Sequence, residues 1–261
     1  MKFVICGKGG CGKSTVTTLL ARQYAATGKR VIVVDTDVSN VGIHRILGAE
    51  ATPDLSEYFG GRKSMMESVR AANEKDIPPG APVLGTWTYS TIPKGYSSIK
   101  DDVQLITIGK LRDTSEGCTC SISTLARQFI LGLALEENDR VIIDTEAGIE
   151  HFGRGIDKLC EAVLMVVDPS YESLCLVKKI SGMADSIEVP LFFVLNKTDS
   201  STSRVLRETI PDRDRIIGEF ELDTDILEAG LEGSVFPFGH PAAATVLDNL
   251  KSRLKADNIA A

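Results

Sequence analysis

The stretch Gly7-Lys8-Gly9-Gly10-Cys11-Gly12-Lys13-Ser14 follows directly on the apolar run 3–6. It fits G-x-x-x-x-G-K-[ST], the pattern of a loop that binds nucleotide phosphates. In such a loop backbone N–H groups surround the β-phosphate, Lys13 neutralises the phosphates and the Ser14 hydroxyl reaches Mg²⁺. Residues 15–27 have the apolar spacing of a helix, whose positive end would point at the anion. The stretch therefore predicts a nucleotide site formed by Gly7, Lys8, Gly9, Gly10, Cys11, Gly12, Lys13, Ser14 and Thr15.

Short apolar runs recur along the chain with helical stretches between them. They cover residues 3–6, 31–34, 105–108, 141–143, 163–167, 191–195 and 216–217. Because hydrophobicity is continuous within each run, we expect strands buried on both faces, hence a mostly parallel sheet. The sequence thus predicts a three-layer α/β fold with about seven or eight strands and helices on both faces. Residues 87–92, beyond the Pro/Gly-rich loop 77–85, are expected to add an edge strand. No linker divides the chain, so we expect a single domain over residues 1–261.

Composition restricts the partners and the compartment. The formal net charge of −7 argues against nucleic acid and anionic membranes, which a basic excess would attract. No apolar run approaches the roughly 18 residues of a membrane span, and no signal-peptide region precedes the first strand. Residues 246–254 place apolar side chains on one face, but this segment is too short and mixed in charge to favour membrane binding over packing. We therefore expect a cytoplasmic protein, in which six cysteines are thiols or metal ligands rather than disulfides.

Carboxylates end two of the predicted strands. Asp35 and Asp37 follow the run 31–34, and Asp144 follows the run 141–143. Carboxylates that leave the C-terminal ends of parallel strands lie on the same edge of the sheet as the phosphate loop. Asp144 has the position of the acidic residue that holds Mg²⁺ through water. The two earlier aspartates could also cap a turn without any role in catalysis.

Lys8, the second residue of the phosphate loop, indicates which class of nucleotide-binding protein the chain resembles. It makes the loop K-G-G-x-G-K-[ST], which resembles the dimerising P-loop ATPases that include the nitrogenase iron protein and the septum-site and plasmid-partition ATPases. The resemblance implies a homodimer in which Lys8 reaches the partner's nucleotide, and Mg²⁺-dependent hydrolysis of ATP to ADP and phosphate. It further implies a first switch near residues 35–45, where Asp37 positions the attacking water and Asp35 supports the loop. Residues 144–155 would form the second switch, where Gly148 offers its N–H to the γ-phosphate.

The stretch Asn196-Lys197-Thr198-Asp199 concerns whether the bound nucleotide carries adenine or guanine. N-K-x-D is the guanine-reading pattern of GTPases, whereas in the dimerising ATPases an Asn at the end of this strand contacts adenine. We expect ATP rather than GTP, because the eight-residue phosphate loop is the more specific match. Asn196 and Lys197 are then nucleotide-contacting candidates, and Asp199 caps a helix near Thr202. The loop 218–223 lacks the proline that relatives have there, which puts a base contact from that loop in question.

Cys118-Thr119-Cys120 lies in a polar stretch ahead of a helix that begins near Ser121. In an extended backbone both thiolates face the same side, so they could bind one soft metal ion. Such a site usually has four ligands, and C-x-C supplies two. Two copies across a two-fold axis would complete the set. The alternative is a pair of ordinary loop thiols.

The chain resembles the carbon monoxide dehydrogenase maturation ATPases in four motifs taken together. These are the phosphate loop, the D-x-D motif at 35–37, the C-x-C motif at 118–120 and the run 147–155. The resemblance implies a dimer that holds one Ni²⁺ or Zn²⁺ through Cys118 and Cys120 of both chains. It implies assistance in nickel insertion into carbon monoxide dehydrogenase or, in a sibling group, acetyl-CoA synthase. Two other classes stay open. One is a reductase like the nitrogenase iron protein, with a [4Fe–4S] cluster and Cys160 as a later ligand. The other is a positioning ATPase without metal.

Overall fold

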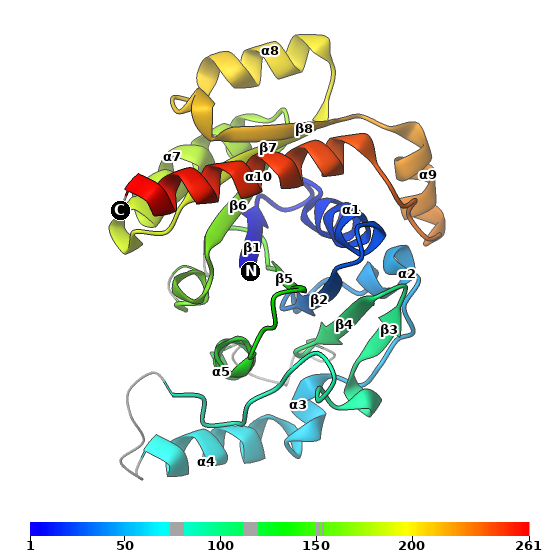
Figure 1. The fold of residues 1–261 in the computed structure, drawn as a ribbon, viewed down its shortest axis with the longest axis vertical. Helices are drawn as coiled ribbons and strands as arrows, with labels where there is room; N and C mark the ends of the chain where they lie inside the picture. The colour runs from blue at the N-terminus through cyan, green and yellow to red at the C-terminus, as the bar shows by residue number, and fades with distance from the viewer. Residues whose placement is uncertain (74–80, 112–119, 150–151, 153, 261) are drawn as a thin grey trace.

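The computed structural model describes residues 1–73, 81–111, 120–149, 152 and 154–260 (Figure 1). The strands are β1 (Lys2–Gly7), β2 (Arg30–Asp35), β3 (Ser98–Lys100), β4 (Val103–Thr107), β5 (Asp139–Asp144), β6 (Ala162–Val167), β7 (Leu191–Thr198) and β8 (Ile216–Glu221). The α-helices are α1 (Lys13–Ala26), α2 (Ile43–Leu47), α3 (Leu55–Tyr58), α4 (Gly61–Asn73), α5 (Cys120–Gly132), α7 (Tyr171–Ile187), α8 (Ser200–Thr209), α9 (Thr224–Glu232) and α10 (Pro241–Ala260). Short 3₁₀ helices are η1 (Lys94–Tyr96), η3 (Asp157–Leu159) and η4 (Arg213–Arg215).

The strands form one eight-stranded sheet in the order β3-β4-β2-β5-β1-β6-β7-β8. The pair β3 and β4 is antiparallel, and the other neighbouring pairs are parallel. This confirms the predicted α/β fold with a mostly parallel sheet. Because β1, β2, β5 and β7 run in the same direction, the loops that follow them share one edge, where open α/β sheets bind ligands.

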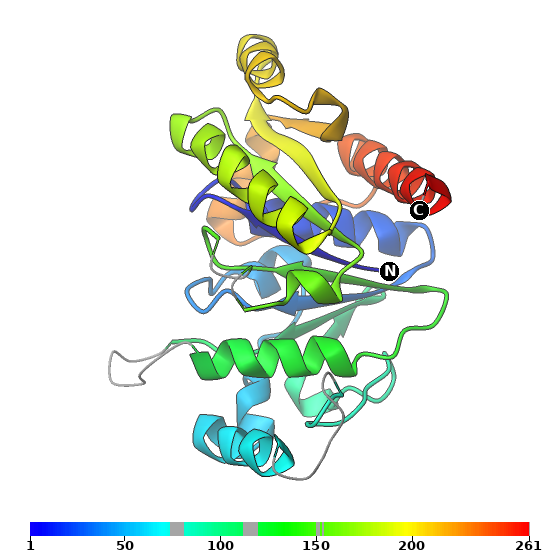
Figure 2. The same cartoon turned by 90° about the vertical axis from the view of Figure 1, so that its left-hand side faces the viewer.

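The continuous hydrophobicity of the strands reflects two cores, one on each face of the sheet. In β1, Phe3 and Ile5 pack with residues of α1 and α10, whereas Val4 and Cys6 pack with residues of α5 and α7. Successive side chains of a strand point to opposite faces, so a strand between two helix layers must be apolar at every position. In Figure 2 the yellow-green α7 and the red α10 lie on opposite sides of the strands.

The edge strand differs from the prediction. Residues 87–92 form no strand, and Trp87 makes only an isolated bridge to Leu133. Trp87 is instead buried, with its ring 5.2 Å from that of Phe129. The edge strand beside β4 is instead β3, which is only three residues long. Burial of the large indole ring against α5 outweighs the β-propensity of this aromatic segment.

The C-terminal helix extends well beyond the predicted segment 246–254. Val246 and Leu250 of α10 are fully buried, so this face packs on the sheet as expected. Within the described ranges, no helix is both long enough and apolar enough to cross a membrane.

Candidate functional site

The phosphate loop, residues 7–14, connects β1 to α1. Gly7 has a φ of 145°, and a Cβ there would lie 2.6 Å from the Val166 carbonyl oxygen. Gly12 has a φ of 98°, and a Cβ there would lie 2.2 Å from Asn196 Nδ2. Both positions therefore require glycine. Gly12 is also the N-cap of α1 and no side chain caps it, so the positive end of the helix is left for an anion.

Ser14 and Asp144 meet at the start of α1. The Ser14 hydroxyl donates to Asp144 Oδ2 at 2.6 Å, and the Thr17 hydroxyl donates to Oδ1 at 3.2 Å. Burial raises the pKa of Asp144 to about 6, although the hydrogen bond from Ser14 and the charge of Lys13 oppose that shift. A hydroxyl and a carboxylate are the hard oxygen ligands that Mg²⁺ prefers. The pair therefore fits a Mg²⁺ ion beside a bound nucleotide.

The loop after β2 brings Asp37 to the same place. Asn40 Nδ2 donates to Ser14 Oγ at 2.7 Å, which ties this loop to the phosphate loop. Asp37 Oδ1 accepts three hydrogen bonds, from the Ser39 amide at 2.9 Å, the Ser39 hydroxyl at 2.7 Å and the Asn40 amide at 3.2 Å. Among the described residues, no donor reaches Asp37 Oδ2. That oxygen is left to accept a hydrogen bond from water.

Asp35 lies beneath this loop and is paired with a lysine. Its Oδ1 accepts from the Asp37 amide at 3.1 Å, and its Oδ2 lies 2.6 Å from Lys110 Nζ. The Lys110 ammonium also donates to the Asp37 carbonyl oxygen. Burial raises the pKa of Asp35 to about 7, and the Lys110 charge limits that rise.

The two lysines of the phosphate loop point to different partners. Lys13 is buried, and its Nζ donates to the Lys8 carbonyl oxygen at 3.3 Å. Lys8 Nζ lies 3.1 Å from Asp168 Oδ2 and 3.7 Å from Glu172 Oε2. The hydrogen bond to Asp168 raises the pKa of Lys8. Lys8 is thus held by the start of α7 in its own chain.

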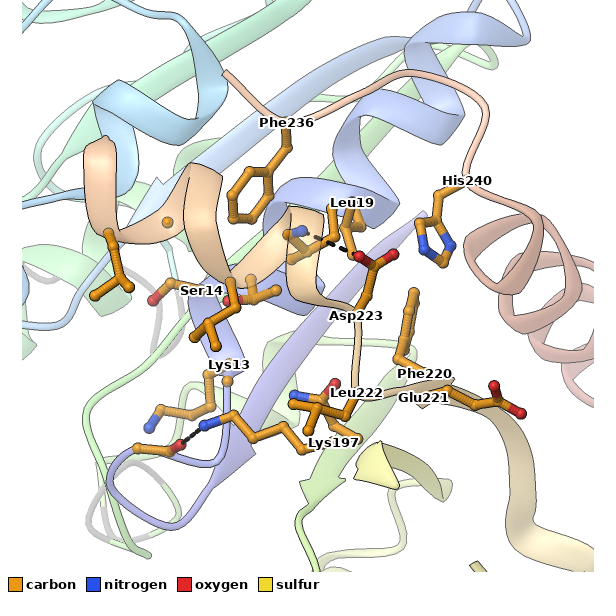
Figure 3. A pocket seen from close by; sticks show the side chains of 18 of the residues that line it. Lys13, Ser14, Leu19, Lys197, Phe220, Glu221, Leu222, Asp223, Phe236 and His240 are labelled. Carbon is orange, nitrogen blue, oxygen red and sulfur yellow. Dashed lines mark hydrogen bonds between the residues drawn. The ribbon is translucent and has the colours of Figure 1, made fainter. Parts of the chain in front are cut away.

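A cavity of about 460 Å³ opens beside the phosphate loop. Figure 3 shows Lys13 and Lys197 at one end and Phe236 and His240 at the other. The cavity is also lined by Glu221, Leu222 and Asp223, although their loop lacks the proline that relatives have there. A charged end next to an apolar end is what a nucleotide requires, because its phosphates and its base differ in polarity. The site residues that share this cavity are Gly10, Gly12, Lys13, Ser14, Thr15, Asp37, Asn196 and Lys197.

The end of β7 contacts the phosphate loop rather than presenting a complete guanine-reading set. Asn196 Nδ2 donates to the Cys11 carbonyl oxygen, and Lys197 Nζ donates to the Gly10 carbonyl oxygen, both at 2.7 Å. Asp199 caps α8, where its Oδ1 accepts from the Thr202 amide at 2.8 Å and the Ser201 amide at 2.9 Å. These hydrogen bonds, that from the Thr202 amide above all, lower the pKa of Asp199 to about 2. The predicted capping role of Asp199 is confirmed.

Gly148 does not line the cavity. Its N–H donates to the Gly7 carbonyl oxygen at 3.1 Å, and its φ is 96°. A γ-phosphate could accept a hydrogen bond from the Gly148 N–H only after the hydrogen bond to the Gly7 carbonyl oxygen breaks. Gly9 lies close by, since a Cβ there would be 3.6 Å from Ala147 Cβ. Residues 150, 151 and 153 of the predicted second switch fall outside the described residues.

The cysteines lie at different places in the fold. Cys118 falls outside the described residues. Cys120 begins α5 and is disulfide-bonded, so the expectation of thiols or metal ligands rather than disulfides is wrong at this position. Because α5 starts on the side where β4 ends, Cys120 lies towards the edge of the sheet that carries the phosphate loop. Cys160 instead precedes β6, at the opposite edge. Six strand residues separate those edges by about 20 Å. Within the described part of the chain, no group of three or more His, Cys, Asp or Glu side chains could hold a metal.

Sequence analysis does not identify three residues that contact the predicted site residues. Asn40 follows Asp37 by three positions, and its place in the predicted first switch was the available signal. Lys110 follows the predicted strand 105–108, so its position at the carboxyl edge could have suggested an ionic partner. Asp168 follows the strand 163–167 in the same way and pairs with Lys8. In each case the sequence indicates the edge of the sheet but not the partner.

Comparison with known proteins identifies the family. Residues 2–236 match the model of the CobQ/CobB/MinD/ParA nucleotide-binding domain. An uncharacterized ATP-binding protein of Methanocaldococcus jannaschii is 40% identical over 233 residues, which cover 89% of this chain and 92% of that protein. The carbon monoxide dehydrogenase accessory protein CooC of Rhodospirillum rubrum is 27% identical over 234 residues, covering 89% of this chain and 88% of that protein.

Among solved structures, the septum site-determining protein MinD of Pyrococcus horikoshii, in complex with Mg-ADP, superimposes with a TM-score of 0.65. It is 17% identical, and the match covers 97% of this chain and 98% of that one. At this identity the likeness concerns the fold, which agrees with the mostly parallel eight-stranded sheet described above.

Proposed function

This chain belongs to the CobQ/CobB/MinD/ParA nucleotide-binding family, and we propose that it is a Mg²⁺-dependent ATPase that works as a homodimer in nickel insertion. One observation supports the ATPase part above all others. The Ser14 hydroxyl, the Asp144 carboxylate and the Asn40 amide converge at the N-terminus of α1, with hydrogen bonds of 2.6 and 2.7 Å. A family relative carries the description of an ATP-binding protein, which is consistent with this site.

In the proposed reaction Ser14 and Asp144 would hold Mg²⁺, which would neutralise charge on the phosphates. The backbone of the phosphate loop and the Lys13 ammonium bind the phosphates. Asp37 orients a water molecule through Oδ2, while its Oδ1 is fixed by the Ser39 and Asn40 amides. Asn196 faces the cavity and contacts the base, and Lys8 of the partner chain stabilises the transferring phosphate. Catalysis then depends on positioning and charge, as phosphoryl transfer does in general.

The metal part of the proposal rests on the C-x-C motif and on similarity. A relative of nearly equal length is described as a carbon monoxide dehydrogenase accessory protein. We infer that Cys118 and Cys120 of two chains bind one Ni²⁺, or Zn²⁺ in its place, as cargo for carbon monoxide dehydrogenase or acetyl-CoA synthase. This binding requires a thiol reductant that first cleaves the disulfide bond of Cys120, because thiolates are the metal ligands. A cluster shared with Cys160, as in the reductase alternative, is less consistent with the fold. Cys120 and Cys160 lie towards opposite edges of the sheet.

Anaerobic purification followed by metal analysis and a visible spectrum tests this proposal. We expect nickel or zinc without a broad iron–sulfur absorption band, together with ATP hydrolysis that requires Mg²⁺. An iron–sulfur band would instead support the [4Fe–4S] reductase. Hydrolysis without any bound metal, after exposure to nickel and zinc, would support a positioning ATPase.

A further inference from the structure

We propose that Lys110 is a positioning residue for ATP hydrolysis, which holds the Asp37 loop at the distance from the phosphates that water activation requires. The inference rests on the proposed ATPase function. It concerns a residue that lies 73 positions from Asp37 in the sequence and does not line the nucleotide cavity. Lys110 would act through Asp35 and Asp37 rather than on the substrate.

The Lys110 side chain joins two parts of the loop after β2. Its ammonium lies 2.6 Å from Asp35 Oδ2 and also donates to the Asp37 carbonyl oxygen. Asp35 Oδ1 in turn accepts the Asp37 amide at 3.1 Å. Asp37 is therefore held at both its N–H and its carbonyl group by one ion pair. The pair is well shielded, because the side chains of Lys110 and Asp35 are 13% and 1% exposed.

The backbone of Lys110 is itself fixed. Its amide donates to Asp54 Oδ2 at 3.0 Å, and its carbonyl oxygen accepts from Arg62 Nη2 at 2.9 Å. The next amide, that of Leu111, donates to the Val38 carbonyl oxygen at 3.2 Å. The ammonium thus projects from an anchored segment, and this segment contacts the loop on both sides of Asp37. A lysine that only neutralised Asp35 would not need the bond to the Asp37 carbonyl.

The consequence for catalysis follows from geometry. Asp37 Oδ1 binds the Ser39 and Asn40 amides, so a shift of the Asp37 backbone moves the carboxylate and those amides together. A displacement of about 1 Å in a reacting group can cost about 10²-fold in rate. Loss of Lys110 should therefore slow hydrolysis and leave ATP affinity intact, because Lys13 and the phosphate loop are untouched.

Three variants test the inference through ATP affinity, single-turnover hydrolysis and hydrogen–deuterium exchange. Lys110→Met should hydrolyse ATP about 10²-fold more slowly, with an unchanged Kd and faster exchange at Ser39 and Asn40. The double variant Asp35→Asn, Lys110→Met leaves no buried charge alone, so it should regain thermal stability but not the hydrolysis rate. Lys29→Met is the matched control, because its ammonium contacts Asn138 on the exposed surface. It should behave as wild type.

Two results would overturn the positioning role. One is hydrolysis at the wild-type rate by Lys110→Met or by the double variant. A wild-type rate in the double variant would mean that the lysine only neutralises Asp35. The other is a parallel loss of ATP binding and hydrolysis in Lys110→Met, which indicates general structural damage. A wild-type chain that binds ATP but never hydrolyses it would overturn the proposed ATPase function, and this inference with it.

Discussion

Lys8 and Asp168 form an ion pair within one chain, with 3.1 Å between Lys8 Nζ and Asp168 Oδ2. Asp168 is fixed in turn by the hydroxyl groups of Ser170 and Ser173 at the start of α7. A lysine held in this way cannot at the same time contact the nucleotide of a partner chain. If Lys8 acts across a dimer, its pair with Asp168 must open first, and that step opposes dimerisation.

Asp168→Asn should therefore strengthen dimerisation in the presence of ATP. A partly exposed ion pair is worth roughly 0.2–1 kcal/mol, so each released pair should favour the dimer by a factor of up to about five. Analytical ultracentrifugation over a range of protein concentrations measures this. Glu172→Gln is the control, because Glu172 is 3.7 Å from Lys8 and largely exposed. Equal dimer affinities of Asp168→Asn and wild type would show that the pair does not restrain Lys8.

The two lysines of the phosphate loop should separate binding from catalysis. Lys13→Ala removes the charge that we expect to neutralise the phosphates, so tight nucleotide binding should disappear. Lys8→Ala should keep nucleotide binding but lose hydrolysis and ATP-driven dimerisation. Calorimetric titration with a non-hydrolysable ATP analogue, followed by sizing, measures both effects. An equal loss of binding in the two variants would contradict the action of Lys8 on a partner chain.

Asp37→Asn should slow hydrolysis without preventing binding. An amide cannot take a proton from water, and loss of a general base usually costs about 10²–10⁴-fold in rate. The variant should still bind Mg-ATP and accumulate as a dimer. Asp144→Asn should instead raise the Mg²⁺ concentration that hydrolysis requires. Parental turnover by Asp37→Asn would mean that another residue, such as Asp35, orients the water.

Asp199→Asn should leave the preference for ATP over GTP unchanged. The Asp199 carboxylate caps α8, and Asn is an equally good N-cap, so stability should change little. A competition titration with ATP and GTP before and after the substitution is the measurement. If wild type prefers GTP and the variant loses that preference, Asp199 reads the base and the interpretation of Asn196 is wrong.

Sequence patterns succeeded where a residue's role depends on its neighbours in the chain. The core strands follow from continuous apolar runs, and the phosphate loop follows from glycines whose φ values other residues avoid, such as Gly7 and Gly12. The Asp199 cap is also local, since its partners lie two and three residues away.

Sequence patterns failed to predict structure where contacts between residues far apart in the sequence determine it. Trp87 lies in a segment with strand-like composition, but its burial against Phe129 removes that segment from the sheet edge. The partners Asp35 and Lys110 are 75 residues apart, and Lys8 and Asp168 are 160 residues apart. Only the strand order brings them together, and no spacing in the sequence encodes it.

The shared metal site is the central claim, and it links metal binding to dimerisation. Half-sites on two chains make the two processes one equilibrium, so each must strengthen the other. Cys118→Ser and Cys120→Ser should lose the metal and any metal-induced dimer, while ATP binding survives. Cys175→Ser is the matched control, because Cys175 is an exposed thiol on α7 and should not affect the metal.

Equilibrium dialysis with Ni²⁺ under reducing conditions, followed by sizing without nucleotide, tests this claim most directly. We expect about one ion per two chains in the wild type, because four thiolates complete one site. The metal-loaded protein should elute as a dimer, and both serine variants should elute as monomers without nickel. One tightly bound ion per monomer, or a nickel content unchanged in both serine variants, would contradict the shared site.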